Sequence, residues 1–67
     1  MEYLDTWHNG YGRLEIYEKD NFKICKLFKD PDKLIDVYQV KKDLANNKLA
    51  DMFLSKLIPQ SQLEFEF

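Results

Sequence analysis

The chain has 67 residues, of which 45% are hydrophobic and 33% are charged. This length and composition exclude a second domain, a disordered tail and a low-complexity segment, so we expect one small domain over residues 1–67. Twelve acidic and ten basic residues give a formal net charge of −2, which disfavours nucleic acids and membranes as partners.

The sequence also indicates a compartment. No apolar run approaches the ~18 residues that a transmembrane helix needs, and the acidic start of the chain lacks the basic segment of a signal peptide. The single cysteine, Cys25, has no partner for an internal disulfide, which suits a reducing environment. We therefore expect a cytoplasmic protein.

Strand patterns begin after the glycine-containing segment of residues 8–12. Residues 13–18 alternate, with Leu14 and Ile16 on one side and charged or tyrosine side chains on the other. Residues 22–28 alternate in the same way after a short polar turn, so the two segments are predicted to form a hairpin. Cys25 is expected on the less buried face of this sheet.

Residues 30–33 have two interpretations that lead to different folds. As a turn, they lead into a third strand over 34–40, which is rich in β-branched and aromatic residues. As a helix start, Asp30 is the N-cap and Pro31 the first helical residue. The composition favours the strand, and the alternative is a hairpin followed by two helices.

A helix is predicted over residues 43–58. Asp43 or Asn47 would cap its start and Pro59 would end it. Apolar residues recur at steps of three and four along one helix face: Ala45, Leu49, Met52, Phe53 and Leu57.

Two further apolar residues, Leu54 and Ile58, lie off that helix face and need some other cover. The tail over 63–67 alternates like a strand and could supply it, or could extend a sheet edge. The expected fold is α+β: a three-stranded antiparallel β-meander, one amphipathic helix and a short C-terminal strand.

The sequence predicts no enzyme, metal site or cofactor. His8 is the only histidine, and a site formed by His8 and Cys25 would need further ligands or catalytic groups. A domain of this size has little room for a nucleophile, a base and a substrate cleft together. His8 is expected in a solvated turn.

Aromatic residues offer a better functional hypothesis. Trp7 stands beside a polar turn, and protein interfaces draw most of their energy from a few aromatic or arginine anchors. The alternative is that Trp7 closes one end of the core. The candidate binding residues are Trp7, Tyr11, Leu54, Ile58, Phe65 and Phe67.

These features predict a non-enzymatic module that binds another protein by occupying its surface. Its small size and Lys/Asn/Asp-rich composition suggest an inhibitor encoded by a phage or mobile element. A nucleic-acid-binding regulator and a small structural homodimer are the alternatives. Five lysines between residues 19 and 33 lie near aromatic residues, but alternation places them on different sides of the predicted strands.

Overall fold

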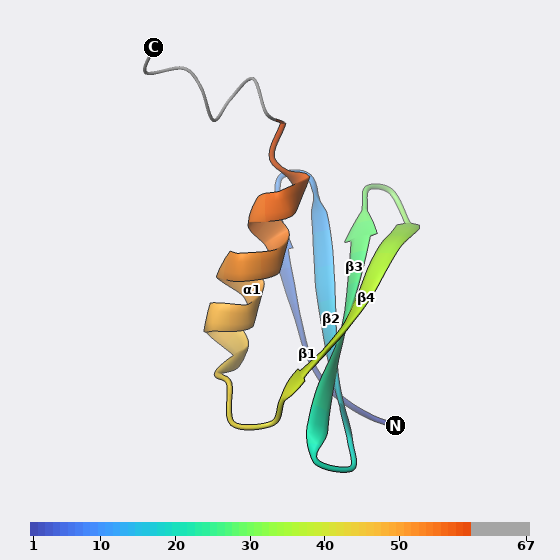
Figure 1. Ribbon diagram of the computed structural model, residues 1–67. Coiled ribbons are helices and arrows are strands. Elements are labelled where there is room, and N and C mark those ends of the chain that lie inside the picture. The colour runs from blue at the N-terminus through green and yellow to red at the C-terminus, as the bar shows by residue number, and fades with distance from the viewer. Residues whose placement is uncertain (60–67) are drawn as a thin grey trace.

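The computed structural model describes residues 1–59, so the predicted strand over 63–67 lies outside the described residues. One antiparallel sheet has a helix across one of its faces (Figure 1). The elements are β1 Glu2–Asn9, β2 Gly12–Lys19, β3 Phe22–Lys29, β4 Lys33–Lys41, α1 Asn46–Leu54 and a 3-10 turn, η1, Ser55–Leu57. The α+β class is confirmed.

The predicted strand count is wrong, because the sheet has four strands in the order β1-β2-β3-β4. The missed strand is β1, whose pairing with β2 shifts register between Tyr3 and Asp5. A β-bulge adds a residue to one strand and so interrupts the alternation of side chains between faces. The apolar pattern of β1 therefore does not repeat every second residue.

The choice at residues 30–33 is settled in favour of the strand. Residues 30–32 form a loop with a cis peptide bond between Asp30 and Pro31, and β4 then pairs antiparallel with β3. The alternative of a hairpin followed by two helices is wrong.

The core lies between α1 and one face of the sheet. On β2 and β3, Leu14 pairs with Leu27 and Ile16 with Cys25, and all four side chains are buried. The prediction that Cys25 occupies the less buried face is wrong. The helix covers the face of Cys25, and the other face, which we call the open face, carries Phe22.

The helix is shorter than predicted and begins differently. It starts at Asn46 with Ala45 at the N-cap, and no side chain caps it, so neither Asp43 nor Asn47 has the predicted role. The Lys23 ammonium instead donates to the Leu44 carbonyl and to Asn46 Oδ1, both at 2.7 Å. Contact with β3 therefore fixes the start of the helix.

The buried face of α1 is rotated from the predicted one. Leu49 and Phe53 are buried as predicted, but Met52 is exposed and Leu54 is buried. Because the additional strand β1 widens the sheet beneath the helix, the sheet itself covers Leu54. The Phe53 ring stacks on Tyr38 of β4 with 4.0 Å between centroids.

Within residues 1–59, no helix is both long and apolar enough to cross a membrane.

Candidate functional site

A groove of about 300 Å³ lies between the edge strand β1 and the helical segment packed beside it. Two stretches more than forty residues apart in the sequence form it. This volume is at the lower end of the range for ligand pockets, so it suits one or two side chains of a partner. The lining residues are Trp7, His8, Asn9, Ala50, Asp51, Leu54, Ser55 and Ile58.

The largest side chain in the groove is Trp7, whose indole is held in place from β1 itself. Its Nε1–H donates to Asp5 Oδ2 at 2.9 Å, while Asp5 Oδ1 accepts the Thr6 backbone N–H at 2.9 Å. The Trp7 residue is still 37% exposed. An oriented, partly exposed indole is the type of anchor that protein interfaces use.

Asn9 joins the two walls of the groove at one end. Its Nδ2 donates to the Leu54 carbonyl at 3.0 Å, which ties β1 to the end of α1. Its Oδ1 accepts the backbone N–H groups of Tyr11 and Gly12 at 2.9 and 3.0 Å. One side chain therefore fixes both the β1–β2 turn and the distance between the groove's walls.

The chemical character of the groove is mixed. Trp7, Ala50, Leu54 and Ile58 supply apolar surface, and Asp51 adds an exposed carboxylate. No group of three or more His, Cys, Asp or Glu residues in the described part of the chain could hold a metal ion. This arrangement can receive an apolar side chain by excluding water from it.

The structure brings together three of the predicted binding residues: Trp7, Leu54 and Ile58. Leu54 is buried, so it contributes to the core as well as to the groove. Trp7 lies within β1, so its predicted place beside a turn is wrong. Tyr11 lies in the β1–β2 turn outside the groove, where its carbonyl accepts the Asp30 N–H at 2.9 Å. Phe65 and Phe67 lie outside the described residues.

Sequence reasoning missed Asn9 and Ala50 as groove residues. A small apolar residue and an amide are common on any surface, and only the docking of α1 on β1 brings them to one place. An Asn followed by a Gly is a turn signal, which indicated a local role for Asn9 but not its bond to the helix.

His8 and Cys25 do not form a reactive pair. Cys25 lies on β3 beneath the helix, and its burial raises the pKa of the thiol to about 11. A thiol with that pKa is almost entirely protonated at neutral pH and is a poor nucleophile. His8 is exposed on β1, two strands away, so its predicted place in a turn is wrong.

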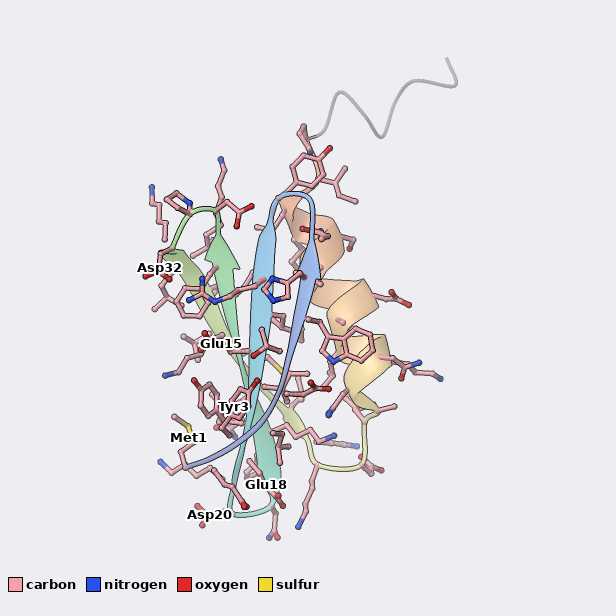
Figure 2. All side chains as sticks on the ribbon, turned by 180° about the vertical axis from the view of Figure 1, so that it is seen from behind. Met1, Tyr3, Glu15, Glu18, Asp20 and Asp32 are labelled. Atoms are coloured by element: carbon pink, nitrogen blue, oxygen red, sulfur yellow. The ribbon has the colours of Figure 1, made fainter. Side chains whose placement is uncertain are left out.

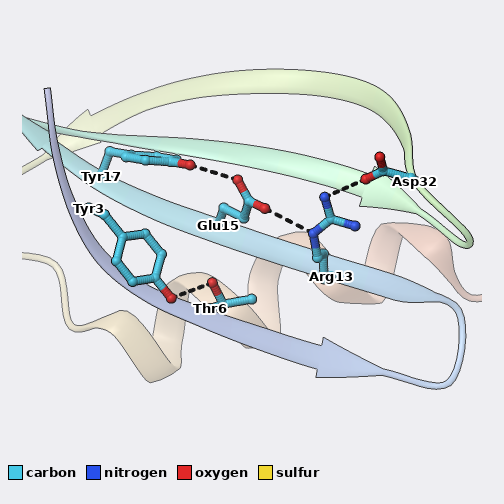
Figure 3. Close-up of polar contacts among 6 residues, drawn as sticks. All are labelled: Tyr3, Thr6, Arg13, Glu15, Tyr17 and Asp32. Carbon is cyan, nitrogen blue, oxygen red and sulfur yellow. Dashed lines mark hydrogen bonds and ion pairs between the residues drawn. The ribbon is translucent and has the colours of Figure 1, made fainter.

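The open face of the sheet carries a second set of organised side chains (Figures 2 and 3). Glu15 accepts hydrogen bonds from Arg13 Nε at 2.9 Å and from Tyr17 Oη at 2.7 Å, and Arg13 also pairs with Asp32. Partial burial would raise the pKa of the Glu15 carboxyl, but these two hydrogen bonds outweigh it, so its pKa is lowered. The bond to Glu15 raises the pKa of Tyr17.

No known family model, curated protein or solved structure matches this chain.

Proposed function

We propose that this chain is a small, non-enzymatic protein-binding module that acts by occupying the surface of a partner. The groove between β1 and α1 receives an apolar side chain of that partner, with Trp7 as the main anchor and Ile58 as a secondary contact. An inhibitor encoded by a phage or mobile element would act in this way, by covering a functional surface of its target.

The observation that carries the proposal is the position of Trp7. Its indole is oriented by Asp5 and lies against a water-accessible groove instead of filling the core. Burial of a ring this large against a partner removes roughly 150 to 250 Å² of surface from water. The high pKa of Cys25 supports a role without covalent chemistry.

A selection from a peptide display library followed by binding measurements tests the proposal. Because Trp7 is the only tryptophan in the chain, a change in its fluorescence reports peptide binding at the groove directly. We expect selected peptides to share an apolar residue and to shift the Trp7 emission. Trp7→Ala should weaken binding of a labelled peptide at least tenfold, as removal of an interface anchor does.

Two further variants make the test specific. Ile58→Ala removes a partly exposed side chain of the groove, so it should weaken binding with little effect on folding. Met52→Ala is the control, because Met52 is an exposed apolar residue of α1 that does not line the groove. Wild-type affinity in folded Trp7→Ala and Ile58→Ala proteins would show that the groove is not the binding site.

A further inference from the structure

The open face of the sheet has a charge opposite to that of the whole chain. Residues directly opposite in an antiparallel pair share a face, so the pairing places the open-face residues unambiguously. Their charged members are the cations Arg13, Lys19, Lys26 and Lys41 and a single carboxylate, Glu15. The formal net charge of −2 therefore averages over two dissimilar sides of the molecule.

The single carboxylate of this face is already neutralised. Glu15 pairs with Arg13 on its own strand and lies opposite Lys26 on β3. Asp32, which pairs with Arg13 from the loop before β4, is the one other acid bonded to these residues among the described contacts. Lys19 and Lys41 lie at one end of the face on either side of Phe22.

Aromatic rings alternate with these cations. The Arg13 guanidinium lies 4.0 Å from the Phe28 ring centroid, and the Lys26 ammonium lies 4.9 Å from that of Tyr17. Tyr3 meets Tyr17 edge to face at 5.7 Å. Tyr3 and Phe22 are 56% and 41% exposed, so surface of both rings is accessible to a ligand. Figure 2 shows Tyr3 and Glu15 among the side chains that lie over the strands.

The edge strands of the sheet are poorly suited to pairing with an additional strand. On β1, Asp5 accepts the backbone N–H of Thr6, and on β4, Asp36 accepts that of Val37 at 2.8 Å. Each edge strand thus uses one backbone donor internally, and inward-bonded charges of this kind oppose the addition of another strand.

From this arrangement we propose that the open face binds single-stranded nucleic acid. Phosphates meet the cations Lys19, Lys26 and Lys41, and bases stack on the exposed rings of Tyr3 and Phe22. Interleaved cations and aromatic rings are what sequence-tolerant binding of single strands requires. The bases of a duplex are already stacked on one another, and the open face presents no element that enters a groove, so a single strand fits better.

Fluorescence anisotropy with labelled oligo-dT and oligo-U of about twelve nucleotides tests the proposal. We expect binding at low salt that weakens steeply as salt rises, because phosphate contacts release counterions. Phe22→Ala should weaken binding at least fivefold. Phe22→Leu keeps an apolar side chain but removes the ring, so an equal loss in both variants identifies stacking.

Lysine variants distinguish binding at the open face from a nonspecific attraction of nucleic acid to any lysine on the protein surface. Lys26→Ala should weaken binding and reduce the salt dependence, whereas Lys48→Ala, at an exposed position of α1, should have little effect. The groove variants Trp7→Ala and Ile58→Ala should retain oligonucleotide binding, so this proposal and the protein-binding proposal can fail separately.

Several results would overturn the proposal. The first is a lack of oligonucleotide binding at low salt. This result overturns the proposal also when sedimentation shows that the protein is a dimer whose interface covers the open face. The second is equal sensitivity to Lys26→Ala and Lys48→Ala. The third is polyglutamate competing as well as the oligonucleotide while Phe22→Ala has no effect, which would identify a surface for acidic proteins.

Discussion

The two faces of the sheet differ in the burial and the polarity of their side chains. The helix face holds the buried side chains of Leu14, Ile16, Cys25 and Leu27, and no polar side chain among residues 1–59 is buried. The open face carries alternating cations and rings, joined by the bonds of Glu15 to Arg13 and Tyr17 (Figure 3). Alternate residues of the same strands supply both faces.

This difference separates the side chains that stabilise the fold from those that are exposed to solvent. Apolar burial beneath α1 holds the chain together, because each large buried side chain stabilises the fold by about 1.5 to 3 kcal/mol relative to an exposed one. Exposed ion pairs and hydrogen bonds contribute much less to folding. Side chains on the open face are thus available for binding without a large effect on the fold.

The largest expected effect comes from truncating a buried side chain between the helix and the sheet. Leu49 of α1 is fully buried, so Leu49→Ala should lower the free energy of unfolding by about 2 to 5 kcal/mol. Val37→Ala, at a half-exposed position of the open face, should change it by less than about 0.5 kcal/mol. Urea denaturation followed by circular dichroism measures both. Equal losses would show that the two faces contribute alike.

A second prediction concerns the close approach of strands β2 and β3 beneath the helical segment. A Cβ at Gly12 would lie 2.0 Å from the Phe28 carbonyl oxygen and 2.6 Å from Leu57 Cδ1. Gly12→Ala should therefore destabilise the protein by about 1 to 3 kcal/mol in the same assay. Gly10→Ala is the control, since no atom lies within 4 Å of the position that a Cβ at residue 10 would occupy. A neutral Gly12→Ala variant would contradict this packing.

A third prediction tests the bond between β1 and the helix. Asn9→Ala removes the donor to the Leu54 carbonyl and the acceptor of two turn N–H groups, which should cost about 1 to 2 kcal/mol. Asn47→Ala changes an exposed asparagine that caps nothing and should be nearly neutral. If Asn47→Ala has the larger effect, the helix start described above is incorrect.

The smallest expected effect is the pH dependence of the open face. Because the folded pKa of Glu15 is lowered, its contribution to stability is complete above the ordinary Glu pKa and is lost as pH falls through the lowered value. Tyr17→Phe removes one hydrogen bond and should raise the Glu15 pKa, as followed by carboxyl NMR. The network would be disproved by a Glu15 carboxyl that titrates at its ordinary value in both proteins.

Much of the fold could be predicted because local patterns were strong. The alternation around Leu14 and Ile16 and the apolar spacing of Leu49 and Phe53 indicated the central hairpin and the helix. The groove could be predicted only in part. Leu54 and Ile58 were identified as apolar residues off the main helix face and Trp7 as an aromatic residue beside a turn, but nothing in the sequence placed the three together.

By itself, the sequence determined the α+β class, the pairing of β2 with β3 and the buried side of β2, because these depend on neighbours within a few residues. The buried side of β3, which carries Cys25 and Leu27, was decided by the packing of α1 on the sheet. Only the tertiary structure decided the roles of β1 and of Leu54. The bulge near Tyr3 interrupts the alternation of apolar and polar residues in β1, so the sequence does not identify this segment as a strand. Its pairing with β2 in the folded protein makes it one. That strand then extends the sheet beneath α1, which buries Leu54, leaves Met52 in solvent and forms the groove beside Trp7.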